Sequence, residues 1–244
     1  MITLTLREPL GVIAAVVPWN SQLFLVAVKI GPALAAGNTV VLKASEHASA
    51  AMLEFGKLVE EAGFPEGVVN IVTGHADPCG RVLTSHPLVQ RISFTGGTTA
   101  ARHVVRNSAE NFAQVSLELG GKSPLLVFDD CDVTAEVARG AAFCFNNTGQ
   151  SCNAASRMLV ERSAYEQAIE AAAATAAATT VDLPSKPGNH IGPLVSEAQF
   201  NKVPGLIQSG IDEGARLVAG GVGRPEGLNR GWFVKPTVFA DTTQ

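Results

Sequence analysis

Apolar segments alternate with helix-like segments along the first half of the chain. Continuous runs of β-branched and other apolar residues predict strands at residues 11–17, 39–43, 68–72, 91–95 and 114–119. Helical patterns separate them, at residues 20–36, 47–62 and 98–107, with a short helix that starts at Asp77-Pro78. Strands that are apolar on both faces and alternate with helices are typical of a covered parallel sheet. We therefore predict a doubly wound, Rossmann-like α/β domain over about residues 10–119.

A second series of elements follows the sequence Gly-Gly-Lys-Ser-Pro at residues 120–124. Its pattern predicts strands at 125–128 and 158–161 and helices at 132–147, 163–178 and 196–210. An alanine-rich tract at 171–180 fits a helix on propensity alone. We expect a second α/β domain over 120–244. The chain stops just after an apolar strand, whose edge would be open, so we expect both domains to be incomplete.

Composition and charge exclude several classes of protein. The 244 residues are 46% hydrophobic, and the net charge of −4 comes without blocks of like charge, which argues against a nucleic-acid surface. The apolar runs are shorter than the roughly 18 residues of a membrane span. Four cysteines without CxxC spacing argue against a metal site. The N-terminal sequence is not typical of a signal peptide, so we expect a cytoplasmic protein with reduced thiols.

Cys152 ends the polar sequence Asn-Asn-Thr-Gly-Gln-Ser-Cys, directly after a predicted helix. From this context alone it has four interpretations: a packed core residue, half of a disulfide, a metal ligand or a nucleophile. The other cysteines, Cys79, Cys131 and Cys144, are expected to pack in the core. A thiol nucleophile needs a nearby cation or helix N-terminus to form its thiolate near neutral pH.

Two polar residues lie where predicted parallel strands end, which is where α/β sheets place their sites. Glu118 stands between Leu117 and Leu119, and desolvation by these neighbours would favour its action as a base. The alternative is a solvated glutamate. Asn20 follows the first strand. It is either the N-cap of the next helix or a donor to a developing oxyanion.

Six sequences in this order connect these residues: PWN, GNTVVLKASE, GFPEGVVNIVTG, ISFTGG, LELGGKSP and GQSC. Over nearly the whole chain, from about Arg7, they resemble the aldehyde dehydrogenase superfamily. The resemblance implies oxidation of an aldehyde to a carboxylic acid. Cys152 would attack the aldehyde as a thiolate, Asn20 would hold the oxyanion, and Glu118 would activate water to hydrolyse the thioester.

The resemblance also implies a dinucleotide site. Its residues in this chain are Pro18, Trp19, Lys43, Ser45, Glu46, Gly96, Gly97, Leu119 and Gly120. A carboxylate such as Glu46 near the adenosine ribose favours NAD over NADP, which stays possible. Gly97 stands where the family more often has Ser, and Ala101 where it has Gly, so one hydroxyl to the pyrophosphate is missing. No metal is implied.

Family members are typically about twice this length, and residues 1–9 resemble the tail of a hairpin used in oligomerisation. We therefore expect a homo-oligomer when the protein is full length. Two alternatives stay open: a relative that passes the thioester to coenzyme A, and a truncated, catalytically silent chain. A water-activating Glu118 argues against the first, and the shortened cofactor domain favours the second.

Overall fold

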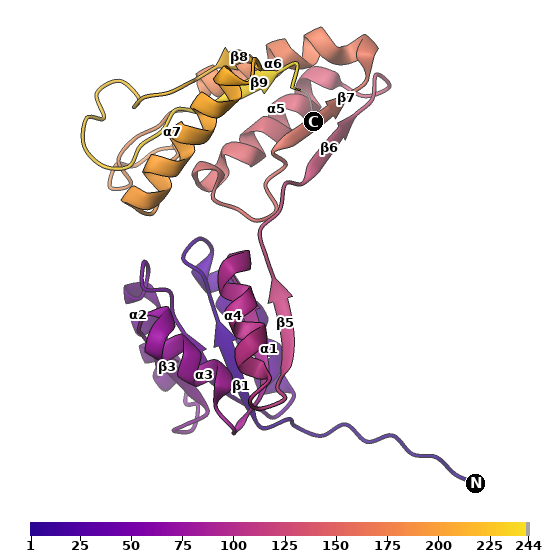
Figure 1. The fold of residues 1–244 in the computed structure, drawn as a ribbon, viewed down its shortest axis with the longest axis vertical. Coiled ribbons are helices and arrows are strands. Elements are labelled where there is room, and N and C mark those ends of the chain that lie inside the picture. The colour runs from indigo at the N-terminus through magenta and orange to yellow at the C-terminus, as the bar shows by residue number, and fades with distance from the viewer. Residues whose placement is uncertain (243–244) are drawn as a thin grey trace. The chain divides into compact units, whose positions relative to one another are not determined.

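The computed structural model describes residues 1–242, and the chain forms two compact units (Figure 1). The first runs from Met1 to Gly120, and the second begins at Gly121. Each unit has its own hydrophobic core. Two clusters of buried side chains lie in the first unit and one in the second.

The first unit is built on a five-stranded parallel sheet. Its strands are β1 (Val12–Val16), β2 (Thr39–Lys43), β3 (Val69–Val72), β4 (Val89–Thr95) and β5 (Gln114–Glu118). Their spatial order is β3-β2-β1-β4-β5, and every neighbouring pair is parallel. The chain therefore reverses its direction of travel across the sheet at β1, as in doubly wound folds. The prediction of a doubly wound parallel sheet is confirmed.

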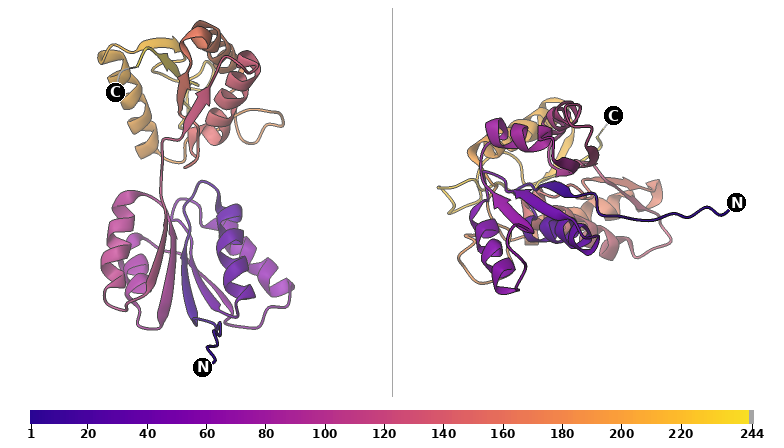
Figure 2. Two further views of the ribbon diagram at one scale, coloured as in Figure 1. Left: turned by 90° about the vertical axis from the view of Figure 1, so that its right-hand side faces the viewer. Right: turned by 90° about the horizontal axis from the view of Figure 1, so that it is seen from below.

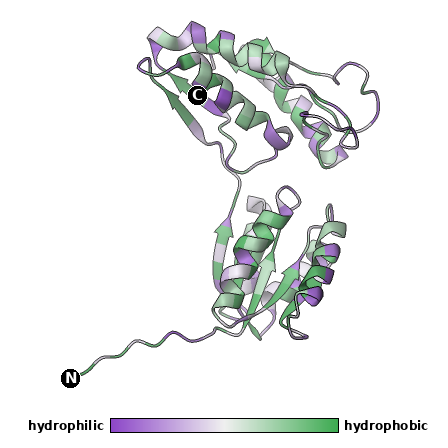
Figure 3. Cartoon of the chain, turned by 180° about the vertical axis from the view of Figure 1, so that it is seen from behind, coloured by the Kyte–Doolittle hydropathy of each residue, from purple (hydrophilic) through white to green (hydrophobic). Residues whose placement is uncertain are grey.

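Helices cover both faces of this sheet (Figure 2). They are α1 (Gln22–Ala35), α2 (Ala50–Glu61), α3 (Arg81–Ser85) and α4 (Thr98–Ser108), with an irregular turn at Ala76–Gly80 before α3. Ile13 and Ala15 belong to the cluster that includes Val26 of α1, whereas Ala14 packs with Val104 of α4. Successive strand residues point to opposite faces, so each core requires apolar residues at alternate positions. This explains why β1 (VIAAV) is apolar throughout and β2 (TVVLK) is apolar over most of its length (Figure 3).

The starts of three helices differ from the prediction. The short helix expected to start at Asp77-Pro78 is α3, which begins at Arg81 after the irregular turn, because Asp77 has a non-helical backbone. Helix α2 begins at Ala50 rather than His47, because the hydroxyl of Ser49 donates to the carbonyl of Ser45 at 2.8 Å and the segment between forms a turn. Helix α1 begins at Gln22, and its N-cap is Ser21. The interpretation of Asn20 as the N-cap of this helix is therefore wrong.

The N-terminal segment, residues 1–10, lies outside the sheet and extends from it (Figure 1). Its apolar residues Ile2, Leu4 and Leu6 alternate with polar ones and are 81–89% exposed. Alternation of this kind is typical of a strand that buries one face. The role of residues 1–9 in an oligomer stays a prediction.

The second unit contains two small sheets and three α-helices. Strands β6 (Pro124–Val127) and β7 (Arg157–Val160) pair in parallel, and β8 (Arg216–Ala219) and β9 (Val238–Ala240) pair antiparallel. The helices are α5 (Val133–Phe145), α6 (Tyr165–Ala178) and α7 (Glu197–Asp212), with short 3-10 turns at Asn146–Gly149 and Arg162–Ala164. The strands expected at 125–128 and 158–161 and the helices expected at 132–147, 163–178 and 196–210 are all present, with ends shifted by at most two residues.

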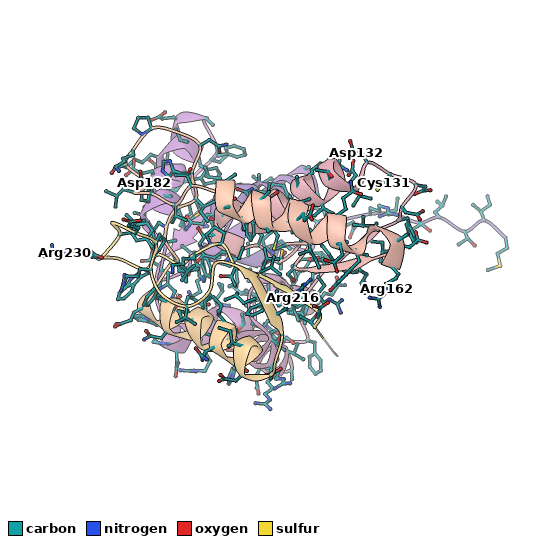
Figure 4. All side chains as sticks on the ribbon, turned by 90° about the horizontal axis from the view of Figure 1, so that it is seen from above. Cys131, Asp132, Arg162, Asp182, Arg216 and Arg230 are labelled. Atoms are coloured by element: carbon teal, nitrogen blue, oxygen red, sulfur yellow. The ribbon has the colours of Figure 1, made fainter. Side chains whose placement is uncertain are left out.

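Local sequence determines where these helices begin and how closely they pack. The carboxylate of Asp132, at the start of α5 in Figure 4, accepts from the backbone N–H of Ala135 at 3.1 Å. Ala168 and Ala172 of the alanine-rich α6 pack with Val137 of α5 in one cluster. Small side chains allow the two helices to approach closely, so the alanine tract serves packing as well as helix propensity.

Asn38 fixes the entry of the central strand. Its buried side chain accepts from the backbone N–H groups of Leu10 at 2.7 Å and Gly11 at 3.0 Å, and it donates to the carbonyl of Ala33 at 3.0 Å. The side chain therefore joins the end of α1 to the start of β1. Because β1 is the central strand of the sheet, this contact helps to fix the position of the residues that follow β1, such as Trp19 and Asn20.

We expect Asn38→Ala to lower the free energy of unfolding of the first unit by about 2 kcal/mol, because it removes the acceptor of two N–H groups and one of the two donors to the Ala33 carbonyl. Chemical denaturation followed by circular dichroism measures the change. Asn70→Ala is the matched control. Its exposed amide makes one hydrogen bond, to the carbonyl of Gly67, and the loss should stay within about 0.5 kcal/mol. Equal losses in the two variants would contradict the anchoring role of Asn38.

Candidate functional site

The residues predicted for the site in the first unit all follow the carboxyl ends of parallel strands. Val16 is paired with Lys43 on one side and with Phe94 on the other, and Thr95 is paired with Glu118. The ends of β2, β1, β4 and β5 therefore lie in neighbouring positions along one edge of the sheet. The reversal of strand order falls between β1 and β4, and such a switch point is where doubly wound sheets bind ligands.

Pro18, Trp19 and Asn20 leave the sheet at the end of β1 and are half-buried. The side-chain amide of Gln22 donates to the carbonyl of Trp19 at 3.3 Å, which fixes the turn into α1. Asn20 lies directly before the N-cap, Ser21. With the capping interpretation removed, an oxyanion donor is the remaining role that the sequence suggested for its amide.

Lys43 and Glu46 form an ion pair at the end of β2. Their Nζ and Oε2 atoms are 3.6 Å apart, and Nζ also donates to the carbonyl of Ala44 at 3.0 Å. Lys43 is buried while Glu46 is exposed, and Ser45 between them is buried and accepts from the N–H of His47 at 3.3 Å. The pair thus places a buried cation and an accessible carboxylate at this strand end.

The Glu46 carboxylate stays in its charged form. Partial burial raises its pKa, but a hydrogen bond to its own backbone and the charges of Lys43, His47 and His75 together leave the pKa below the usual value for glutamate. A fixed negative charge at the end of β2 is therefore part of the site near neutral pH.

Gly96 and Gly97 join β4 to α4. A β-carbon on Gly96 would lie 2.6 Å from the ring of Phe94, so this position requires glycine. The Gly96 N–H donates to the carbonyl of Glu118 at 3.0 Å, so it is used within the sheet. Gly97 is the N-cap of α4 and has no side chain to occupy the N–H groups of the first turn. Those groups and the helix dipole make this end suitable for an anion.

Glu118 ends β5, with Leu119 and Gly120 directly after it. The expectation that Leu117 and Leu119 desolvate Glu118 is wrong, because Glu118 is exposed and Leu117 is 38% exposed. Leu119 packs against the core cluster that contains Ile92 and Phe94. Neighbours in a strand point to opposite faces, so they cannot surround the side chain between them.

A residue that the sequence interpretation missed lies close to Glu118. Lys29 of α1 is buried and donates from Nζ to the hydroxyl of Ser93 at 2.9 Å. Burial lowers the pKa of Lys29 from 10.5 to about 8, and the negative charge of Glu118 partly opposes this shift. The signal was present in the sequence: Lys29 is the single charged residue in the otherwise apolar or uncharged helix Gln22–Ala35.

Thr95 adds a buried polar group to the same edge. Its side chain is 7% exposed, and its hydroxyl has no hydrogen-bond partner among residues 1–242. Buried hydroxyls are nearly always paired, so this one needs an explanation. Thr95 is the last residue of β4, two residues after Ser93 and directly before Gly96, so it lies beside the predicted site residues.

Cys152 belongs to the second unit and is exposed at the end of a strained loop. Asn147, Thr148 and Gly149 have consecutive positive φ angles of 51°, 57° and 72°. A left-handed conformation is unfavourable for a β-branched residue such as Thr148. Strain of this kind persists where the surrounding structure enforces it, and it is found most often at functional sites.

Hydrogen bonds to residues 192–195 hold this loop. The hydroxyl of Thr148 donates to the carbonyl of Gly192 at 2.8 Å, and the side chain of Gln150 accepts from the N–H of Val195 at 2.9 Å. The Gln150 amide also donates to the carbonyl of Asn147 at 3.0 Å. The segment before Cys152 is therefore fixed from two sides, which favours a defined position for the thiol.

The other thiols have different environments. Cys144 lines an apolar cavity of about 320 Å³ together with Phe145, Thr148 and Gly149. Burial raises the pKa of the Cys144 thiol, and Lys122 opposes this only in part. The prediction that Cys131 packs in the core is wrong, because it is exposed, with Sγ donating to the carbonyl of Phe128 at 3.1 Å.

Metal-ligand clusters and membrane-spanning helices were both expected to be absent from this chain. Among residues 1–242, no three His, Cys, Asp or Glu side chains lie together as a metal site would need. No helix in that range is long and apolar enough to cross a membrane.

The whole chain matches a family model. Residues 1–244 match the model described as "Aldehyde dehydrogenase family". The chain belongs to this family, and the resemblance inferred from the sequence is confirmed.

Two solved structures and one curated protein illustrate the similarity. An aldehyde dehydrogenase from Bartonella henselae is 46% identical, with a TM-score of 0.94, over 97% of this chain and 49% of that one. A mutant of aldehyde dehydrogenase C from Pseudomonas syringae, complexed with NAD+ and octanal, is 41% identical, with a TM-score of 0.94, over 97% and 49%. A dehydrogenase of a (Z)-2-((N-methylformamido)methylene)-5-hydroxybutyrolactone from Acinetobacter baylyi is 54% identical over 88% of this chain and 44% of its own length. The chain thus spans about half the length of these relatives.

The buried Lys29 gives a test of the site that depends on pH. Between pH 8 and 10.5 the unfolded chain binds a proton at this lysine that the folded chain does not, so stability rises with pH across this window. From pH 7 to pH 10, we expect wild type to gain about 2 kcal/mol in unfolding free energy relative to Lys29→Met. Urea denaturation at both pH values measures the gain.

The control for this experiment is Lys57→Met. Lys57 is exposed on α2 and paired with Glu54 at 2.7 Å. Its difference from wild type should be the same at both pH values. A Lys29→Met difference that also stays constant would show that the ammonium is not desolvated in the folded protein.

Proposed function

We propose that this chain contributes the central part of an NAD-dependent aldehyde dehydrogenase that oxidises an aldehyde to a carboxylic acid. One observation carries the proposal. In a chain of this family, Asn20, Glu46, Gly97 and Glu118 all follow neighbouring strand ends at the switch point of one parallel sheet. A thiol nucleophile on an enforced loop, Cys152, completes the chemistry that the sequence implies.

The sheet edge fits a dinucleotide by its own features. The anion-binding end of α4 suits a pyrophosphate, because the Gly97 cap leaves the first-turn N–H groups uncovered. Glu46 can accept hydrogen bonds from ribose hydroxyls and disfavours a 2′-phosphate, so we propose NAD as the preferred cofactor. The unpaired hydroxyl of Thr95 is accounted for if a bound polar group completes this edge. When bound, NAD supplies the hydride acceptor.

Covalent chemistry falls to Cys152. Its thiolate attacks the aldehyde carbon, a C–S bond forms, and the carbonyl oxygen becomes an oxyanion. The side-chain amide of Asn20 and the backbone N–H of Cys152 stabilise this charge as hydrogen-bond donors. For a thioester to form, this carbon must lose its hydrogen as a hydride, which the bound cofactor would accept. A thiol serves both halves of the reaction, because it attacks readily and is later displaced readily from the thioester.

Hydrolysis of the thioester falls to Glu118. Its carboxylate takes a proton from water while the water oxygen attacks the thioester carbon. The C–S bond then breaks, the carboxylic acid leaves, and Cys152 is free again. Exposure of Glu118 in the first unit leaves its carboxylate open to water. Lys29 places a titratable positive charge within electrostatic range of this base.

We expect Cys152→Ala to abolish NADH formation from an aldehyde and NAD, by roughly 10⁴-fold or more, because the covalent route is lost. Absorbance of NADH measures the rate. Cys144→Ala is the matched control, since this half-buried thiol lies eight residues away and lines the neighbouring cavity. Activity that survives in Cys152→Ala would exclude the mechanism. A wild-type chain that binds NAD but makes no NADH would instead support the catalytically silent alternative.

We expect Glu118→Gln to form the thioester but to hydrolyse it roughly 10²–10⁴-fold more slowly, because the general base is lost. Rapid mixing should show a burst of at most one NADH per Cys152, and mass spectrometry should detect the acyl adduct. Glu60→Gln, at an exposed position of α2, should behave as wild type. A full steady-state rate in Glu118→Gln, or turnover in wild type that requires coenzyme A, would favour the acylating alternative.

A further inference from the structure

Residues 192–195, which we call the strap, bond to the loop that leads to Cys152. The hydroxyl of Thr148 donates to the carbonyl of the first strap residue at 2.8 Å. The side chain of Gln150 accepts from the N–H of the last strap residue at 2.9 Å and makes a longer contact, at 3.5 Å, to the carbonyl of the second. Two side chains of the loop thus make three polar contacts with the strap.

The strap is itself fixed on its other side. Leu194 is buried, and its N–H donates to the carbonyl of Trp232 at 2.9 Å. The ring of Trp232 packs against Phe200 of α7, with the ring centroids 5.6 Å apart, and the guanidinium carbon of Arg224 lies 4.3 Å from the centroid of Phe200. Aromatic and cation–π contacts of this kind stabilise a packed surface. The strap is therefore anchored independently of the loop that it holds.

Packing does not hold the loop itself. None of the residues Asn146–Gly149 is buried, and Thr148 and Gly149 line the apolar cavity of about 320 Å³. The left-handed conformation of Thr148 costs energy, which other contacts must offset. Within the loop, the backbone N–H and the side-chain amide of Gln150 both donate to the carbonyl of Asn147, at 3.1 and 3.0 Å. Polar contacts through Gln150 and Thr148 therefore hold the loop in this strained form.

We propose that Gln150 is a positioning residue for Cys152, through which the strap fixes the backbone of the nucleophile. The inference rests on the proposed function, because it takes Cys152 to attack an aldehyde. That attack requires the sulfur to meet the aldehyde carbon while the N–H of the same residue faces the oxyanion, so the backbone here must be fixed. A displacement of about 1 Å can lower a rate roughly 10²-fold. Gln150 thus affects the reaction without contacting the reacting atoms.

The first experiment needs no substrate or cofactor. Hydrogen exchange, measured by mass spectrometry on peptides that cover residues 145–155, reports how often the loop opens. Gln150→Met keeps the length of the side chain but can neither accept from the strap nor donate to Asn147. Exchange in these peptides should become roughly 5- to 30-fold faster, the size expected for one or two lost hydrogen bonds. Peptides from β6 and β7 should keep their wild-type rates, and an unchanged rate in the loop would overturn the inference.

The matched control is Gln167→Met, at an exposed position of α6. Gln167 also donates from its amide, to the hydroxyl of Thr134 at 2.9 Å, so this variant loses a hydrogen bond elsewhere in the second unit. Exchange in the loop peptides should stay at the wild-type rate. Faster exchange of the loop in both variants would mean that it responds to any loss of stability, and the role of Gln150 would be excluded.

Two variants of Thr148 test the strap from the other side chain. Thr148→Val keeps the β-branched shape but cannot donate to the strap, and exchange of the loop should quicken. Thr148→Ser keeps the hydroxyl donor and removes the branch, so exchange should be no faster than in wild type. Equal quickening in the two variants would show that the bond to the strap does not hold the loop.

The second experiment distinguishes positioning from binding. In aldehyde oxidation, Gln150→Met should lower kcat roughly 10- to 100-fold with little change in KM or in the dissociation constant of NAD, because the geometry of attack is lost rather than a contact with either ligand. A wild-type kcat in Gln150→Met would overturn the positioning role even if the loop exchanges faster. A wild-type chain that makes no NADH would overturn the proposed function, whereas hydrogen exchange would still decide whether Gln150 and the strap hold the loop.

Discussion

The parallel pairing of β1 with β2 on one side and β4 on the other is the constraint on which the first unit depends. It requires crossover helices on both faces, so β1 must be apolar on both. It also brings the ends of four strands to one edge. Asn20, Lys43, Gly96 and Glu118 are far apart in sequence, yet each stands within four residues of a paired strand end. Asn38 stabilises this arrangement from the other end of β1 by joining it to α1.

Much of this architecture could be predicted from the sequence, because continuous apolar strands, helical periodicity and glycine at helix ends are local signals. The errors arose where the environment of a residue depends on where its side chain points in the fold, and not on its neighbours in the sequence. Leu117 and Leu119 flank Glu118 in sequence but point to the opposite face of the sheet. Asn20 is a good capping residue, yet the chain turns one residue later, at Ser21. Lys29 of α1 was missed because the residues that act on it, Ser93 of β4 and Glu118 of β5, are more than 60 residues away in sequence.

The second unit shows how backbone geometry distinguishes two thiols of the same short segment. Cys144 is on the last turn of α5, where the helix turns it toward an apolar cavity and burial raises its pKa. Cys152 follows three left-handed residues that lead the chain out of the helix and leave this thiol exposed. The motif predicts a loop at this place. The sequence does not reveal that Thr148 and Gln150 enforce it through bonds to residues 192–195, because that segment is more than 40 residues away.

A lysine and a glutamate interact at two places along this sheet edge, and the two interactions have different effects on the pKa values of the side chains. At the end of β2, Lys43 lies 3.6 Å from Glu46, and the pKa of that carboxyl is lowered, so a fixed charge results. Near the end of β5, Glu118 acts on a lysine that burial has already brought to a pKa of about 8, so that cation is sensitive to proton concentration. The difference follows from what each lysine contacts. Lys43 forms an ion pair with Glu46 and also donates to the carbonyl of Ala44. Within residues 1–242, the hydrogen bond of the Lys29 ammonium is to the neutral hydroxyl of Ser93. In the proposed function, the fixed charge would accept from a ribose and the titratable one would lie near the base that takes a proton from water. The different charge behaviour of these two lysine–glutamate pairs follows from burial and pairing rather than from residue type.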